Sequence, residues 1–90
     1  YFVERAMDML ARELKMDPAE VRRRNFIPKD RFPYATQMGA VYDSGDYGKA
    51  LDAALEACNW PALVAERDAA RKEGRLVGLG LAMYVEVCGL

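Results

Sequence analysis

The sequence predicts an α+β fold with three to four helices, a long ordered loop and one C-terminal β-strand, forming a fragment of a larger domain. Three observations support this. Apolar residues recur at helical spacing in several segments, no regular period runs through residues 27–43, and apolar residues alternate strictly with small or polar ones after residue 76. Ninety residues are enough for at most one small domain.

The composition excludes several classes of protein. Apolar residues make up 52% of the chain and charged residues 30%, as in a folded protein. A net charge of −1 argues against a general nucleic-acid binder, and no apolar run is long enough to cross a bilayer. Tyr1 to Arg5 do not resemble the start of a signal peptide. Cys58 and Cys88 lack metal-ligand spacing, and intracellular disulfides are rare, so we expect two buried, reduced thiols in a cytoplasmic protein.

A first helix is predicted at about residues 1–15. Its apolar stripe consists of Val3, Met7, Leu10 and Leu14. The charged residues of this segment lie on the other side of the helix: Glu4, Arg5, Asp8, Arg12 and Lys15. The helical pattern starts on the first residue without an N-cap, which suggests a segment of a longer chain.

A second helix is predicted at about residues 18–25. Asp17 is suited to the N-cap, Pro18 to the first helical position, and Glu20 to the reciprocal position of a capping box. Asn25 is a candidate left-handed terminator. The arginines at 22–24 fall in the last turn, where cations complement the helix dipole; a phosphate site is the alternative.

Residues 27–43 are predicted to form a long ordered loop, because two prolines, a glycine and scattered aromatic residues leave no helical or strand period. Four aromatic side chains in and after this loop are candidate loop or interface anchors: Phe32, Tyr34, Tyr42 and Tyr47. Loops of this length are usually functional or packed over a neighbouring surface, so both roles stay open at this point.

Two further helices are predicted at about residues 45–58 and 61–73. For the first, Asp43 or Ser44 is expected to be the N-cap, with Asp46 in the first turn. The second starts at Pro61, ends at Gly74 and has a thin apolar face, so we expect it on the surface.

A strand is predicted at about residues 76–87. Its odd positions are all apolar: Val77, Leu79, Leu81, Met83, Val85 and Val87. Its even positions are mostly small or polar: Gly78, Gly80, Ala82, Tyr84, Glu86 and Cys88. A single strand leaves its backbone groups unpaired, and no second strand of similar quality is present in the sequence. We therefore expect its pairing partners in another part of the polypeptide or in another subunit.

No self-sufficient active site is evident in the sequence. The chain contains no histidine and no metal-ligand spacing. The glycines at 78 and 80 lack the third glycine of a dinucleotide fingerprint, and a strand follows them instead of a helix. Asp43 and Asp46 could act as paired carboxylates, but capping is favoured; Glu86 either reaches a site or faces water. We assign no catalytic, cofactor-binding or metal-binding residue.

Three stretches nevertheless resemble a known family. "ERAMDMLARELKMDPAEVRRRNFI", "FPYATQMGAVYDSGDY" and "GRLVGLGLAMYVEVCG" are similar, in this order, to parts of the molybdenum hydroxylase large subunit. This is the xanthine dehydrogenase/aldehyde oxidase family, and the likeness is strongest to the carbon monoxide dehydrogenase-like large chain. The resemblance covers essentially the whole chain and implies an internal fragment of the molybdopterin-binding region.

The resemblance implies an oxidoreductase that carries molybdopterin cytosine dinucleotide and hydroxylates aldehydes or N-heterocycles, or oxidises CO. It further implies [2Fe–2S] clusters and FAD on companion subunits or domains. The partners would be the remainder of the large subunit and the iron–sulfur and flavin subunits. The family's glycine-rich cofactor motifs do not occur in these residues, so this segment is expected to be scaffold, inactive alone and without a cofactor of its own.

Under this interpretation, the four aromatic anchors hold the loop against the rest of the molybdenum-binding domain or across a subunit contact. Direct contact with substrate is the lesser alternative. A hypothesis from another class is a non-catalytic helical interaction module that adds its C-terminal strand to a partner's sheet.

Overall fold

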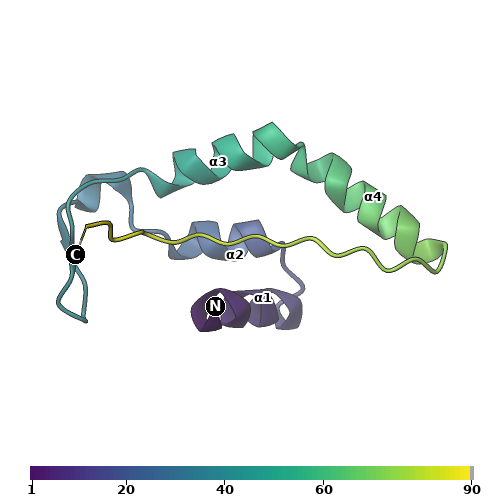
Figure 1. Cartoon of the computed structure of the whole chain (residues 1–90), viewed down its shortest axis with the longest axis horizontal. Coiled ribbons are helices and arrows are strands. Elements are labelled where there is room, and N and C mark those ends of the chain that lie inside the picture. The colour runs from purple at the N-terminus through teal and green to yellow at the C-terminus, as the bar shows by residue number, and fades with distance from the viewer. Residues whose placement is uncertain (90) are drawn as a thin grey trace.

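The computed structural model describes residues 1–89 (Figure 1). It contains four helices: α1 (Phe2–Glu13), α2 (Pro18–Asn25), α3 (Tyr47–Cys58) and α4 (Trp60–Lys72). A 3-10 turn, η1, spans Lys29–Arg31, and two short strands, β1 (Tyr34–Ala35) and β2 (Val41–Tyr42), pair antiparallel. The α+β class with four helices is thus confirmed. The helix ends lie within two residues of those predicted.

The helices form an open, single-layer arrangement rather than a closed bundle. In Figure 1, α2 lies between α1 and α3, and α4 continues from α3 at an angle. The bend is at Asn59, whose left-handed φ of 52° ends α3, while Pro61 lies at the start of α4. Trp60 ties this bend to the start of α2, because its Nε1–H donates to Asp17 Oδ2 at 3.0 Å.

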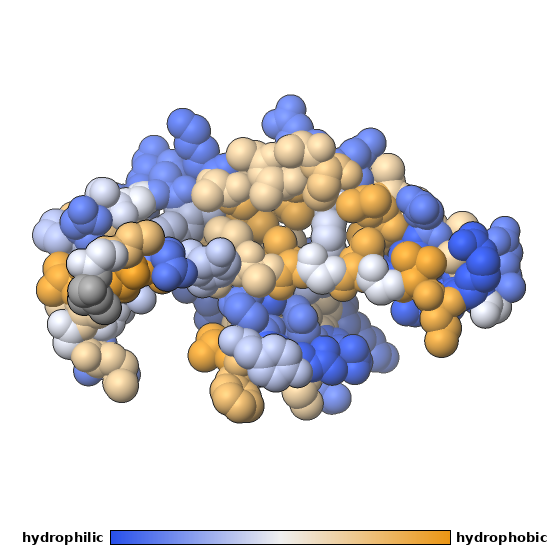
Figure 2. Space-filling model, viewed as in Figure 1, coloured by the Kyte–Doolittle hydropathy of each residue, from blue (hydrophilic) through white to orange (hydrophobic). Residues whose placement is uncertain are grey.

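The core is small for a chain of this length. Only five apolar residues in the described part are buried: Ala11, Ala19, Val21, Leu51 and Ala70. The accessible surface is 7305 Å², whereas a compact protein of this mass exposes about 5300 Å². The radius of gyration is 15.5 Å, against about 12 Å for a compact 90-residue domain. Much apolar surface therefore remains uncovered, as a fragment of a larger domain requires, and Figure 2 shows hydrophobic residues in orange exposed on the viewed face.

The packing of α1 is not the one that its apolar stripe predicts. Val3, Leu10 and Leu14 are 73%, 40% and 56% exposed. Glu4 and Asp8, on the charged side of the helix, face α2 and are only partly exposed. The physical reason is Arg22 of α2, whose buried guanidinium requires carboxylates on the facing helix. Much of the apolar stripe of α1 therefore stays exposed in this structure.

The loop at residues 27–43 contains a β-hairpin that the sequence pattern did not reveal. Tyr34 pairs with Tyr42 and Ala35 with Val41, and the Gly39 N–H donates to the Thr36 carbonyl at 3.1 Å to close the turn. Gly39 has φ +88°, a conformation that favours glycine. Strands of two residues are too short to produce any detectable period, which explains the error.

The predicted strand at about residues 76–87 is not a β-strand in this structure. This C-terminal segment is extended and crosses the molecule in Figure 1, but it forms no ladder with any of residues 1–89. The reason is that the strands β1 and β2 pair with each other, and no other strand exists among the described residues. The expectation that its partners lie elsewhere stays a prediction.

Two predicted helix-end residues are also wrong. The N-cap of α3 is Asp46, whose Oδ1 accepts the Lys49 N–H at 3.1 Å, and neither Asp43 nor Ser44 has this role. Asn25 does not end α2 in a left-handed conformation; it stays helical, and its side chain donates to the Val21 carbonyl at 2.8 Å. By contrast, Asp17 caps α2 as predicted, accepting the Ala19 N–H at 2.7 Å.

Candidate functional site

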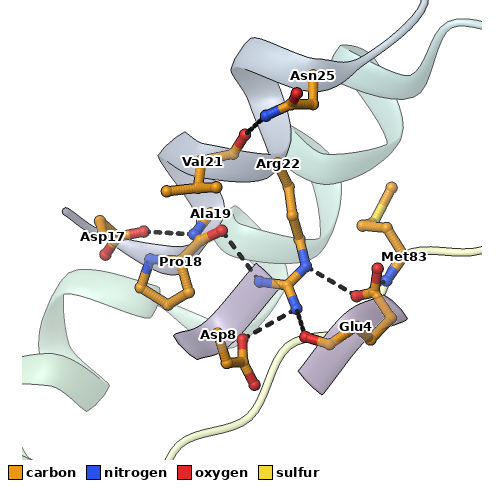
Figure 3. Close-up of polar contacts among 9 residues, drawn as sticks. All are labelled: Glu4, Asp8, Asp17, Pro18, Ala19, Val21, Arg22, Asn25 and Met83. Carbon is orange, nitrogen blue, oxygen red and sulfur yellow. Dashed lines mark hydrogen bonds and ion pairs between the residues drawn. The ribbon is translucent and has the colours of Figure 1, made fainter. Parts of the chain in front are cut away.

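The most connected polar group of the chain is the Arg22 side chain, which is 2% exposed (Figure 3). Its Nε donates to Glu4 Oε2 at 2.8 Å, and its Nη2 donates to Asp8 Oδ1 at 2.9 Å and to the Glu4 carbonyl at 3.1 Å. Its Nη1 donates to the Pro18 carbonyl at 3.1 Å. One cation therefore binds two successive turns of α1 to α2.

Glu4 extends this cluster to the C-terminal segment. The same Oε2 that accepts from Arg22 also accepts the backbone N–H of Met83 at 2.9 Å (Figure 3). The contact joins residues 79 positions apart in the sequence. We call Glu4, Asp8, Arg22 and the Met83 N–H the Arg22 cluster.

The electrostatics of the cluster keep the guanidinium charged. Burial lowers the pKa of Arg22, but the hydrogen bonds and charges of Glu4 and Asp8 raise it by more, so the net pKa lies above its ordinary value. A buried arginine that has two carboxylates and two carbonyls as acceptors is well satisfied. These contacts hold the guanidinium between α1 and α2.

The other two arginines of the triplet are also paired. Arg23 donates to Asp52 of α3 at 2.6 Å, and Arg24 donates to Glu20 at 2.8 Å. Because all three guanidinium groups contact carboxylates, the structure does not favour the phosphate-site alternative. Arg22 and Arg23 instead connect α2 to the helices on either side.

The predicted anchors Phe32 and Tyr47 do come together. The Tyr47 ring lies edge-to-face against Phe32, with centroids 5.5 Å apart, and against Phe26, with centroids 5.9 Å apart. All three side chains are half-buried. The Tyr47 hydroxyl is buried and has no hydrogen-bond partner among the described residues. Burial, together with the nearby Tyr42 and Asp43, raises the pKa of Tyr47.

The predicted anchors Tyr34 and Tyr42 form the cross-strand pair of the hairpin. Tyr42 is half-buried, whereas Tyr34 is 37% exposed. The hairpin tip is still more open, with Met38 94% exposed. Of the four predicted anchors, Phe32, Tyr42 and Tyr47 are therefore half-buried, and Tyr34 is the most exposed.

An open groove of about 360 Å³ lies beside the Arg22 cluster. Its lining is mostly apolar and comes from α1, the end of α2, the loop, the start of α3 and the C-terminal segment: Val3, Met7, Phe26, Ile27, Tyr42, Tyr47, Met83 and Val85. The charged groups at its edge, Glu4 and Arg22, are bound to each other. The groove thus presents apolar surface with few unsatisfied polar groups.

The remaining candidate residues are not assembled into a site. Asp43 Oδ1 accepts the Ser44 N–H and Asp46 caps α3, so each carboxylate has a local partner. Glu86 is exposed. Cys58 and Cys88 are both exposed free thiols, not buried ones as expected. Within residues 1–89, no group of three or more acidic, histidine or cysteine side chains is arranged to hold a metal ion.

No helix in the described part of the chain has both the length and the apolar character needed to cross a membrane.

Comparisons with known proteins identify the family. Residues 1–26 match the family described as "Molybdopterin cofactor-binding domain". The carbon monoxide dehydrogenase large chain of Hydrogenophaga pseudoflava is 49% identical over 99% of this chain. A solved structure of carbon monoxide dehydrogenase from Oligotropha carboxidovorans superposes with a TM-score of 0.73 and 41% identity over 80% of this chain. This chain belongs with the large subunits of the molybdenum hydroxylases. The resemblance read from the sequence is confirmed.

The likeness to these large subunits concerns a small part of them. A third relative, the nicotine 6-hydroxylase large subunit of Paenarthrobacter nicotinovorans, is 41% identical over 96% of this chain. The chain spans 12% of the Hydrogenophaga protein, 10% of the Paenarthrobacter protein and 9% of the matched Oligotropha chain. The uncovered apolar surface of this molybdenum hydroxylase segment is consistent with that small share.

Sequence reasoning missed the Arg22 cluster. Glu4 and Asp8 are four residues apart, so they lie on one helix face, and a triplet of arginines follows in the next helix. That combination was the available signal for an ion-paired helix interface. The pairing itself joins residues 14 and 18 positions apart, which no short-range period reveals.

Proposed function

We propose that this chain is part of a molybdenum-dependent oxidoreductase that hydroxylates aldehydes or N-heterocycles, or oxidises CO. The names of the relatives support this: two are carbon monoxide dehydrogenase large chains and one is a nicotine 6-hydroxylase large subunit. The whole enzyme would carry molybdopterin cytosine dinucleotide and exchange electrons with [2Fe–2S] and FAD subunits in the cytoplasm. Molybdenum and FAD would supply the redox chemistry.

Within that enzyme, we propose that this segment is scaffold rather than active site. The observation that carries the proposal is the Arg22 cluster, in which the buried charged groups satisfy one another and join three separate parts of the chain. The groove beside it is mostly apolar, and its charged groups are occupied. The residues of this groove do not fit a polar pterin dinucleotide, because that group needs hydrogen-bond donors and acceptors for its ring edge and its phosphates.

The experiment uses the complete large subunit purified with its companion subunits. We expect stoichiometric molybdenum and cytidine nucleotide, and oxidation of an aldehyde, an N-heterocycle or CO. A complex without molybdenum would overturn the assignment of the whole protein. A gene product that consists of these 90 residues alone, and that binds the sheet of another protein, would support the interaction-module hypothesis instead.

The scaffold role is tested with the double variant Tyr34→Ala/Tyr42→Ala. We expect a lower melting temperature or weaker assembly, while KM for the substrate stays unchanged, because under this proposal the pair only supports the hairpin. Met38→Ala, at the exposed hairpin tip, is the matched control and should change neither quantity. A changed KM with intact assembly would instead indicate that the loop contacts substrate.

A further inference from the structure

The C-terminal segment offers a row of unpaired backbone groups. From Leu76 to Gly89, no backbone N–H or C=O forms a hydrogen bond with another backbone group of residues 1–89. The one polar contact recorded for this backbone is the Met83 N–H to Glu4 Oε2. Unpaired groups along an extended segment are a template for strand addition.

Burial along the segment alternates from residue to residue, as in a strand, from Val77 to Met83. The half-buried residues are Val77, Leu79, Leu81 and Met83, and the exposed ones are Gly78, Gly80 and Ala82. The odd side chains therefore lie against the helices, and the even ones point away from them. In such a strand the peptide groups of odd and even residues point to opposite edges.

The two edges are not equivalent. We call the edge formed by the N–H and C=O groups of the odd-numbered residues the odd edge, and the opposite one the even edge. On the odd edge, the Glu4 carboxylate accepts the Met83 N–H, as the carbonyl of a neighbouring strand would. The carboxylate cannot easily move away, because Arg22 holds the same oxygen at 2.8 Å and is itself buried. In the described residues, no side chain occupies the even edge in this way.

We propose that the even-numbered edge of residues 76–88 receives a β-strand from the remainder of the same large subunit, and that Glu4 closes the odd edge. The inference rests on the proposed function, since the occupant is a part of that subunit outside this chain. The relatives support this occupant, because 88% of the Hydrogenophaga large chain lies outside the region matched by this chain. Gly78 and Gly80 have no side chain and Ala82 has only a methyl group, so this face of the resulting sheet has room for a further layer.

The test is residue-resolved amide hydrogen exchange on the complete large subunit in its complex, read by fragmentation mass spectrometry. We expect the amides of Gly80, Ala82 and Tyr84 to exchange about 100-fold or more slowly than those of Leu79 and Leu81. The Met83 amide should also be slow, because Glu4 holds it. Equal protection at odd and even positions, or the reverse alternation, would overturn the proposal.

Variants at Glu4 test the closure of the odd edge. In Glu4→Ala, the Met83 amide should exchange about tenfold faster, while Gly80 and Ala82 stay protected. Glu4→Gln keeps a neutral acceptor and should give a smaller acceleration, which provides a readout if the alanine variant does not fold. The matched control is Asp8→Asn, which alters an Arg22 contact but no contact to the segment. An unchanged Met83 rate in both Glu4 variants would contradict the proposal.

The same samples distinguish a failure of the proposed function from a failure of the proposed strand pairing. Molybdenum content is measured beside exchange, so loss of molybdenum in the wild-type complex counts against the proposed function alone. Protection of the even amides that depends on protein concentration would indicate a second copy of the chain as the occupant, and would overturn the assignment of the strand to the same subunit.

Discussion

Arg22 Nε lies 2.8 Å from Glu4 Oε2, and this single contact connects α2 to α1 and, through the same oxygen, to the C-terminal segment. Few apolar side chains of the described chain are buried, so the relative positions of α1, α2 and the C-terminal segment depend strongly on this polar contact.

Replacing Arg22 by Met should destabilise the large subunit substantially. Glu4 and Asp8, 23% and 32% exposed, would lose their common cation between two helices. We expect a decrease of about 2–3 kcal/mol in the free energy of unfolding of this region, somewhat below the usual cost for a fully buried pair because water reaches the carboxylates. Thermal unfolding of the complex measures the effect.

The control for this prediction is Arg24→Ala, which removes an exposed i,i+4 pair with Glu20. It should change stability by about 0.5 kcal/mol or less. If both variants have the same small effect, the Arg22 cluster is not the connection that the structure indicates.

Replacing Tyr47 by Phe should be neutral or stabilising by about 1 kcal/mol, because the hydroxyl is buried without a partner in the described residues. Tyr47→Ala should cost about 3 kcal/mol, since it removes both edge-to-face contacts. A loss of more than about 1 kcal/mol in the Phe variant would mean that the hydroxyl finds a partner in the rest of the subunit.

The raised pKa of Tyr47 also predicts a pH dependence. The folded state holds the phenolic proton more tightly than the unfolded state does. The resulting stabilisation is present in full below the ordinary pKa of about 10 and is lost as the pH rises toward the folded value. Unfolding of the wild type should therefore become easier above about pH 10 to a greater extent than unfolding of Tyr47→Phe. Parallel pH profiles would contradict this.

Replacing Gly45 by Ala should disrupt the aromatic cluster. A Cβ at this position would lie 2.7 Å from Tyr47 Cε1 and 3.1 Å from Phe32 Cζ. Because these rings are packed against each other, we expect a loss of about 1–3 kcal/mol in thermal unfolding.

Gly48 provides the matched control, since it lies three residues away in the first turn of α3, and a Cβ there would meet only Asp46 Oδ1 at 3.9 Å. Gly48→Ala should stabilise the helix by about 0.5–1 kcal/mol. Equal effects of the two substitutions would argue against close packing at residue 45.

Replacing Asp46 by Ala should cost about 1 kcal/mol, because Asp46 accepts the Lys49 N–H as the N-cap of α3. Asp43→Ala should cost less, since Asp43 contacts only Ser44, in the loop before the helix. Denaturation of the two variants compares them directly. A larger loss at Asp43 would restore the cap expected from the sequence.

Local features were the ones that the sequence predicted well. The Asp17 cap, the proline at the start of α2 and the helical spacing of apolar residues act over a single turn, so they fold in the same way in any context. The alternation after residue 76 likewise appears as alternating burial as far as Met83.

The features that sequence analysis missed have two different causes. Two are local: the two-residue strands of the hairpin are too short to show a period, and Asp46, three residues after Asp43, is the N-cap of α3. The side of α1 that faces α2 depends instead on a distant residue, because buried Arg22 pairs with Glu4 and Asp8.

The helices, the extended C-terminal segment and the likeness to molybdenum hydroxylase large subunits follow from the amino-acid sequence, because short-range periodicity and capping depend on neighbouring residues. The inward orientation of Glu4 and Asp8 and the hydrogen bond from Met83 to Glu4 are evident only from the folded chain. These contacts join positions up to 79 residues apart, and the desolvation of one guanidinium, rather than any local pattern, selects them.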